Sequence, residues 1–191
     1  MKRIFATLAV ALLVTTTLAA CGGDDQTPRT RDFNNADVTF AQQMIPHHQQ
    51  AVQRAKLART QASSPEVKAL AKKIEAAQGP EIDTMQGWLE EWGRSDDSDD
   101  DSMHSMDGDS MHGMHMPGMM SDDDMMRLGK GRGVDFDSMF LTMMIEHHEG
   151  AIEMARTEQT DGQNAHAKAL AVDIEKAQTA EIAQMKQMLR S

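Results

Sequence analysis

An internal repeat constrains the fold of this chain more than any other feature. MIPHHQQAV at 44–52 returns as MIEHHEGAI at 144–152, and the offset of 100 holds without a gap over residues 37–90 and 137–190. Of these 54 aligned positions, 21 are identical. A fixed offset of this kind is typical of a duplicated structural unit. The chain therefore contains two copies of one unit, separated by a linker.

Each copy has the pattern of two helices. In the first copy, residues at steps of three and four form one apolar-lined face on each helix. The first helix has Phe40, Met44, His47, His48, Ala51 and Ala55, and the second has Val67, Leu70, Ile74, Ala77, Glu81, Met85 and Leu89. Ser64-Pro65 between the two stripes predicts a serine cap with proline at the first helical position. In the second copy, Asp161-Gly162 marks the break and Asn164 the cap.

No strand pattern is present, so the predicted fold class is all-α. Two helical hairpins, 34–93 and 134–191, can bury their apolar faces against each other as an antiparallel four-helix, ferritin-like bundle. Pro46 and Gly79-Pro80 fall inside the first hairpin only, so we expect the two hairpins to bend differently. Within the linker, 94–133, SDDDMMRLG at 121–129 predicts a short helix capped by Ser121, and 94–120 lacks any hydrophobic period and is expected to be disordered.

The N-terminal segment indicates export. Lys2 and Arg3 precede the apolar run IFATLAVALLV and then LAAC, the pattern of a cleavable signal peptide over 1–20. Leu18-Ala19-Ala20-Cys21 resembles a lipobox, in which Cys21 is lipidated; the alternatives are an ordinary signal peptide or an uncleaved anchor. Residues 21–33 would be a flexible tether. This places the protein at the outer face of the cytoplasmic membrane or in the periplasm, with membrane contact through the lipid only.

The charge of the chain excludes one class of partner. Loss of Lys2 and Arg3 with the signal peptide takes the net charge from −11 to −13. A nucleic-acid-binding protein is expected to carry a basic stripe, so no nucleic acid is predicted as a partner. The run DDSDDD at 96–101 favours a solvated linker over a site for a hard metal ion.

Polar residues interrupt the apolar stripes at equivalent places in both copies. A buried carboxylate needs a partner, so we expect Glu81 against His47/His48 and Glu181 against His147/His148, with Gln78 and Gln178 completing the network. Such a layer can be structural, or it can hold metal together with Met44 and Met144. The paired Glu-x-x-His motifs of a di-iron bundle are missing, which counts against an oxidoreductase.

The linker carries a second candidate site. Residues 103–120 hold seven methionines and three histidines without helical spacing, and thioethers select copper(I) or silver(I), whereas imidazole also takes copper(II). The candidate ligands are Met103, His104, Met106, Met111, His112, Met114, His115, Met116, Met119 and Met120. The alternative is a compositionally biased linker that binds nothing.

The duplicated MI-x-HH motif, the Q-x-x-E-I-x-x-M helices and PGMMSDDDM resemble the bacterial family of domain of unknown function 305, over roughly residues 33–191. The resemblance implies a ferritin-like helical bundle, and for some members extracytoplasmic copper binding and tolerance. It would place the family signature on His47, His48, His147 and His148, with Met44, Met143 and Met144 beside them.

These observations together predict a lipid-anchored, non-enzymatic protein that captures copper, most readily copper(I), with copper(II) or silver(I) as alternatives. A copper-handling protein could be its partner. Two other functions stay open, a ferritin-like metal-dependent oxidoreductase using the histidines with Glu81 and Glu181, and a helical interaction module that binds no metal.

Overall fold

The computed structural model describes residues 31–94 and 116–191. Within these ranges the chain forms five helices and no strand: α1 (Asn35–Gln61), α2 (Pro65–Glu91), α3 (Asp122–Lys130), α4 (Gly133–Asp161) and α5 (Ala165–Met188). The predicted all-α fold of two helical hairpins and one short helix is thereby confirmed. The expected signal peptide, the lipidated Cys21 and residues 103–115 of the Met/His segment lie outside the described ranges.

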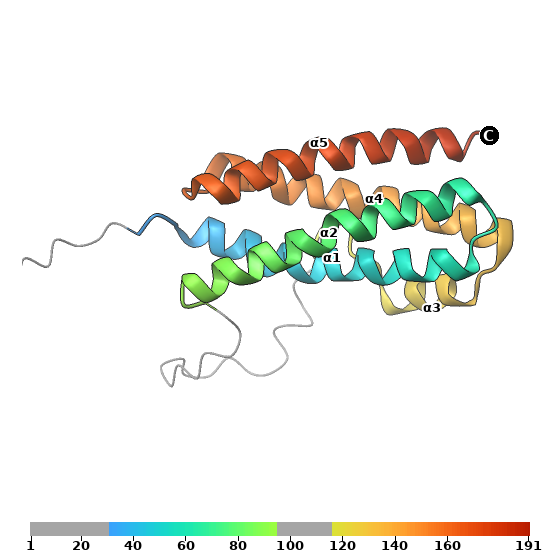
Figure 1. Ribbon diagram of the computed structural model, residues 1–191, viewed down its shortest axis with the longest axis horizontal. Helices are drawn as coiled ribbons and strands as arrows, with labels where there is room; N and C mark the ends of the chain where they lie inside the picture. Colours follow the sequence, from blue (N-terminus) through green and yellow to red (C-terminus); the bar gives the residue numbers. More distant parts are fainter. Residues whose placement is uncertain (1–30, 95–115) are drawn as a thin grey trace, which may run out of the picture. The chain divides into compact units, whose positions relative to one another are not determined.

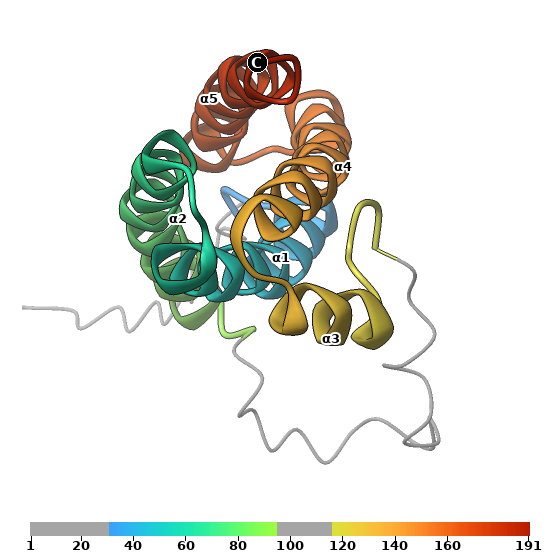
Figure 2. The same ribbon diagram turned by 90° about the vertical axis from the view of Figure 1, so that its right-hand side faces the viewer.

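The four long helices form an antiparallel bundle. The α1–α2 hairpin and the α4–α5 hairpin lie side by side, with α1 packed along α4 (Figure 1). Viewed end-on, the four helices surround a common centre, and the short helix α3 lies outside them (Figure 2). None of the helices in the described ranges combines the length and apolar character that a membrane crossing requires.

The helix ends follow the local signals in the sequence. Ser64 accepts hydrogen bonds from the backbone N–H groups of Glu66 and Val67, and Pro65 is the first residue of α2. Asn164 caps α5 and Ser121 caps α3 in the same way, as predicted. Pro46 and Pro80 lie inside α1 and α2, each of which is assigned as one helix of 27 residues.

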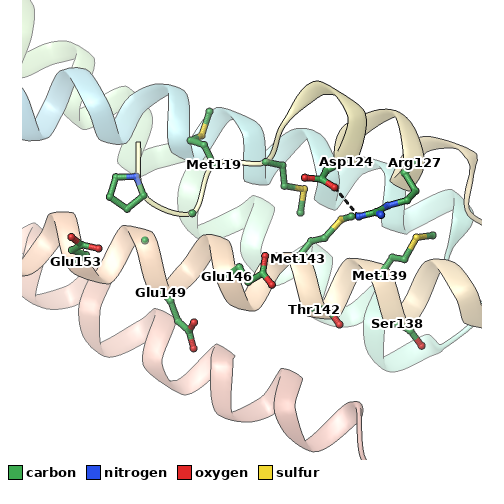
Figure 3. Close-up of a pocket in the computed structure, with 14 residues that line it drawn as sticks. Met119, Asp124, Arg127, Ser138, Met139, Thr142, Met143, Glu146, Glu149 and Glu153 are labelled. Carbon is green, nitrogen blue, oxygen red and sulfur yellow. Dashed lines mark hydrogen bonds and ion pairs between the residues drawn. The ribbon is translucent and has the colours of Figure 1, made fainter. Parts of the chain in front are cut away.

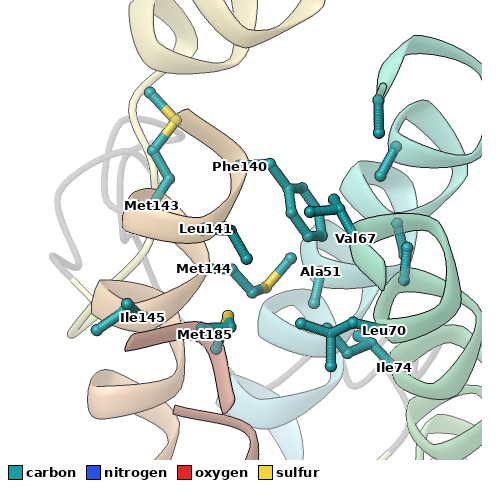
Figure 4. Close-up of a cluster of buried hydrophobic side chains, with 14 of the residues drawn as sticks. Ala51, Val67, Leu70, Ile74, Phe140, Leu141, Met143, Met144, Ile145 and Met185 are labelled. Carbon is teal, nitrogen blue, oxygen red and sulfur yellow. The ribbon is translucent and has the colours of Figure 1, made fainter. Parts of the chain in front are cut away.

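The core between the helices combines small residues with large apolar ones. Ala51, Ala55 and Ala58 on α1 are fully buried, and their small side chains let the neighbouring helices approach closely. Phe140 and Met144 of α4, Leu70 and Ile74 of α2, and Met185 of α5 fill the space between them (Figure 4). Met44 is also fully buried, in a second apolar cluster nearer the N-terminal end of α1.

Two equivalent aspartates join the hairpins. Asp137 at the start of α4 accepts hydrogen bonds from the backbone N–H groups of Ser63 (3.1 Å) and Ser64 (2.9 Å) in the α1–α2 turn. Asp37 at the start of α1 does the same for Gln163 (3.0 Å) and Asn164 (2.8 Å) in the α4–α5 turn. Each hairpin thus caps the turn of the other, and this reciprocity fixes how α1 and α4 are aligned.

Candidate metal centre

All four histidines of the repeated motif lie in the middle of the bundle. His47 and His48 on α1, and His147 and His148 on α4, are fully buried. Because α1 and α4 run antiparallel, equivalent residues meet where the helices cross. The rings of His47 and His147 stack there with centroids 3.6 Å apart and planes inclined by 32°.

The flanking histidines each bind a glutamate. Nε2 of His48 lies 2.7 Å from the Glu81 carboxylate, and Nε2 of His148 lies 2.7 Å from that of Glu181. The structure thus places one histidine of each motif against the glutamate that the sequence analysis paired with it. A carboxylate accepts, so Nε2 carries the proton, and in a neutral ring the lone pair is then on Nδ1. Neither Nδ1 atom has a hydrogen-bond partner in the described part of the chain.

The other two histidines differ from this expectation. His47 donates from Nε2 to the backbone carbonyl of Pro117 (3.0 Å), and its Nδ1 has no partner among the described residues. His147 has no partner at either nitrogen within residues 31–94 and 116–191. The glutamines also do not complete the network, because the buried Oε1 atoms of Gln78 and Gln178 accept no hydrogen bond there. That prediction was wrong: the stripe brings the glutamines inward, but their carbonyl oxygens meet no donor.

The environment keeps the stacked pair neutral. Burial lowers the pKa of His47 to about 3, with further lowering from the neighbouring His48, Arg54 and His148 that outweighs the Pro117 carbonyl. Burial, followed by His47 itself, also places the pKa of His147 well below its usual value. A neutral imidazole is the form that binds a metal ion, so one nitrogen of each of these two rings offers a lone pair at physiological pH without first losing a proton.

A short segment covers the stacked pair from one side. We call residues 116–120 the strap. Its Met120 exchanges two hydrogen bonds of 3.1 Å with the Gln50 side chain of α1, and its Pro117 carbonyl binds His47. The sequence predicted disorder through residue 120, and for 116–120 this was wrong. Hydrogen bonds to α1 and close packing against α4 hold the strap in place. Such long-range contacts leave no local pattern in the sequence.

Two glycines let the strap approach α4. Gly118 has a φ of +73°, and a Cβ there would lie 2.5 Å from the Glu146 carbonyl oxygen and 3.0 Å from the Cα of His147. A Cβ on Gly150 would collide with the backbone of Pro117. Both positions therefore need glycine, one for its backbone conformation and both for the absence of a side chain.

Replacing Gly150 with alanine is expected to displace the strap. Alanine favours a helix by about 1 kcal/mol over glycine, but the collision with Pro117 and the loss of the His47 hydrogen bond should outweigh this and lower stability by about 1–3 kcal/mol. Urea unfolding followed by circular dichroism measures the effect. Gly87→Ala is the control, since nothing lies within 4 Å of a Cβ there, and it should stabilise. Equal stabilisation by both variants would show that the strap is not seated on α4.

A groove of about 700 Å³ lies beside the strap, between α3 and α4. Met119 and Met120 of the strap line it together with Met139 and Met143 of α4, and Glu146, Glu149 and Glu153 follow α4 along its length (Figure 3). An ion pair of 2.7 Å between Asp124 and Arg127 closes its α3 side. Met119 and Met120, candidate ligands from the sequence, therefore lie against the bundle at this groove.

The histidine layer fits a soft or borderline metal ion by its donors, but its arrangement is incomplete. Met44 and Met144 are fully buried one helical turn before His48 and His148, on the same helix faces. No group of three or more His, Cys, Asp or Glu residues in the described ranges is placed to hold a metal. Binding here would thus require side-chain rearrangement and thioether ligands.

Sequence reasoning missed Arg54. Its side chain is fully buried, with Nε directed at the sulfur of Met125 (3.3 Å) and Nη2 bonded to Gln50. Burial lowers its pKa to about 9, and Asp124 opposes this only in part. The repeat held one signal, since the equivalent position 154 is a methionine. Arg54 links α1 to α3 and adds positive potential beside the stacked histidines.

Comparisons with known proteins agree with this fold. The family model for the domain of unknown function DUF305 matches residues 37–189. A DUF305 protein from Streptomyces coelicolor, described as secreted, is 33% identical with a TM-score of 0.70 over 81% of this chain and 92% of that one. A search of curated proteins returned no match.

Three similar solved structures are metal-bound forms of one protein, CopM. CopM in its Cu(II)-bound form is 33% identical, with a TM-score of 0.64 over 81% of this chain and 95% of CopM. CopM in its Cu(I)-bound form is 31% identical, with a TM-score of 0.63 over the same shares. A silver-bound form of CopM is similar as well, at 32% identity and a TM-score of 0.61.

Proposed function

The chain belongs to the DUF305 family, and from this premise we propose that it is an extracytoplasmic, lipid-anchored protein that captures copper(I). The observation that carries the proposal is a set of four buried imidazoles, beside buried thioethers, whose Nδ1 atoms have no hydrogen-bond partner among residues 31–94 and 116–191. Such atoms are costly unless water or a ligand pairs with them. Solved structures of CopM, which shares the fold at 31–33% identity, include a Cu(I)-bound and a Cu(II)-bound form.

The Glu81–His48 and Glu181–His148 pairs support the proposal. Histidines that bind metal usually donate their other ring N–H to a carboxylate, which fixes the ring and strengthens the ligand. Here, in both repeats, Nε2 is bonded to glutamate and Nδ1 meets no partner within the described residues. With Met44 and Met144, the layer offers the imidazole and thioether donors that suit copper(I).

The Met/His segment would be the first site to bind copper, and the histidine layer of the bundle would be the second site. The candidates Met103, His104, Met106, Met111, His112, Met114 and His115 end one residue before the strap, which starts at Met116 and is bonded to His47 through Pro117. An ion wrapped by the segment would then be close to the layer of His47, His48, His147 and His148. Cys21, carrying the lipid, would keep the protein at the membrane, where it could pass copper to a handling protein.

Copper(I) titration against a competing chelator tests this proposal. The full chain without its lipid, residues 22–191, is compared with the same protein lacking 95–115, which leaves the strap in place. We expect several ions per full chain and one or two for the shortened form. Equal stoichiometry would put binding in the bundle alone. No competitive binding by either form would leave the layer as a structural element and would favour an interaction module.

The alternative enzymatic function is a ferritin-like oxidase. In this structure one carboxylate oxygen of Glu81 and one of Glu181 already bind a histidine, so each glutamate could bind a metal ion through its other oxygen only, unless that pair breaks. Metal-dependent oxidation that survives deletion of 95–115 and disappears on Glu81→Gln would favour the oxidase.

A further inference from the structure

The two ends of the bundle differ by one buried carboxyl group. Asp37 and Asp137 occupy the same position of the repeat, and each binds the turn of the other hairpin. At position 58 of the first copy stands a buried alanine, whereas the equivalent residue of the second copy is Glu158. The end formed by α1 and the α4–α5 turn therefore contains a second acid that the opposite end lacks.

Glu158 is buried without a conventional partner. The residue Glu158 is 1% exposed. Neither of its carboxyl oxygens receives a hydrogen bond from an N–H or O–H group in the described part of the chain. Gly162 gives it room, since a Cβ there would collide with the Glu158 carboxyl. The group that Glu158 does meet is the carboxyl of Asp37, which is 0% exposed. Two carboxylates only accept, so this contact requires that one of them carries a proton.

The proton belongs to Glu158. The Asp37 oxygens accept from the backbone N–H groups of Asn34 (2.6 Å), Gln163 (3.0 Å) and Asn164 (2.8 Å). Burial alone would raise the pKa of Asp37, but these bonds and the one from Glu158 outweigh it and lower the value. Burial raises the pKa of Glu158 to about 8, and the contact with Asp37 adds to this.

Neither the other charged groups nearby nor a cation in place of the proton changes the assignment of the proton to Glu158. Lys168 on α5 lowers the pKa of Glu158 and Asp161 on α4 raises it, both by less than Asp37 does. The ammonium of Lys168 is bonded to the Gly162 carbonyl at 3.1 Å. A hard cation would need six or more oxygen ligands, and the Asp37 oxygens are already engaged by three N–H donors.

We propose that Asp37 and Glu158 share one proton and form a pH-sensitive latch between the first turn of α1 and the α4–α5 turn. Figure 1 shows these two segments together at one end of the bundle. The proton turns a repulsive pair of buried acids into a hydrogen bond. Its loss leaves two buried charges facing each other and opens this end first. The opposite end, with Asp137 and Ala58, has no such dependence.

The direction in which pH changes the stability of the latch follows from the raised pKa of Glu158. Glu158 titrates at about 8 in the folded chain, above its ordinary 4.5, so the folded state holds the extra proton between these values. The latch is therefore fully stable below pH 4.5, weakens as the pH rises toward 8, and stays constant above that. Asp37 has a lowered pKa, and its own contribution is lost only when the pH falls below its ordinary value of 3.8.

Amide hydrogen exchange of the full chain tests the latch. One proton of difference changes a local opening equilibrium tenfold per pH unit. We expect the protection factors of the Gln163 and Asn164 amides to fall by up to tenfold per unit between pH 5 and 8, then level off. The Ser63 and Ser64 amides, held by Asp137, are the internal reference and should not show this fall.

The matched variant is Glu158→Gln, which keeps the shape and offers an N–H to Asp37 at every pH. It should remove the pH dependence at Gln163 and Asn164. It retains the exposed His166 of α5, so that side chain is the same in the variant and in the original protein. A variant that keeps the dependence, or equal slopes at both ends of the bundle, would overturn the latch. If the glutamine variant folds poorly, Glu158→Ala, which copies Ala58, should also abolish the slope.

Discussion

Replacing Met103, Met106, Met111 and Met114 with leucine is expected to remove most copper(I) binding from the Met/His segment while copper(II) binding largely remains. Leucine has a similar size and no donor atom. Thioethers bind copper(I) but contribute little to copper(II), which prefers imidazole. The apparent affinity for copper(I) should fall at least about tenfold, equivalent to about 1.4 kcal/mol. Competition titrations with a chelator for each oxidation state measure both effects.

The converse variant sharpens this test. Replacing His104, His112 and His115 with glutamine should weaken copper(II) binding and spare most copper(I) binding. Met126→Leu with Met188→Leu is the methionine control, since neither residue is a candidate ligand and Met126 is 56% exposed. If the two sets of variants lose both oxidation states equally, or lose nothing, the segment does not discriminate by donor chemistry and its proposed role fails.

Replacing His147 and His148 singly with leucine is expected to give opposite effects on stability. The two residues are neighbours on α4, and both are fully buried. Neither ring nitrogen of His147 has a partner in the part of the chain that the structure describes, so an apolar side chain of similar size should leave stability unchanged or raise it by about 1–2 kcal/mol. His148 is bonded to Glu181 at 2.7 Å, so its replacement leaves that carboxylate unpaired and should cost about 1–3 kcal/mol.

Chemical unfolding in the absence of metal measures the change in stability of both variants. The same measurement with copper separates a structural role of the histidine layer from a metal-binding role. An ion bound by the native state stabilises it in proportion to its affinity. The protein lacking 95–115 should unfold at a higher temperature with copper(I), and His147→Leu should reduce that gain. Strong destabilisation by His147→Leu together with an unchanged copper effect would mean that the stacked histidines are structural only.

Much of the fold could be predicted because its signals are local. A cap such as Ser64 binds backbone groups two and three residues away, and the apolar stripes repeat every three to four residues. The pairing of His48 with Glu81 was predictable as well, because a carboxylate on an inward face needs a partner and few polar residues share that layer.

The candidate site was harder to predict because it is built from contacts between distant segments. The stacking of His47 on His147 depends on where α1 crosses α4, which the reciprocal binding of Asp37 and Asp137 sets. Those two aspartates are the first identical pair of the repeat, and this was the one signal that could have pointed to them. The glutamine carbonyls show the opposite case: the stripe turned them inward, but only the packed structure shows that no donor reaches them.

The sequence by itself determined two helical hairpins, their caps and the inward direction of the repeated histidines, since each depends on residues a few positions apart. Only the tertiary structure decided that the strap lies on α4 at Gly150, that His47 binds Pro117, and that Glu158 meets Asp37. These contacts join residues 33 to 121 positions apart. They depend on close packing of buried surfaces and on which polar atoms remain unpaired there, and no periodicity along the chain records either.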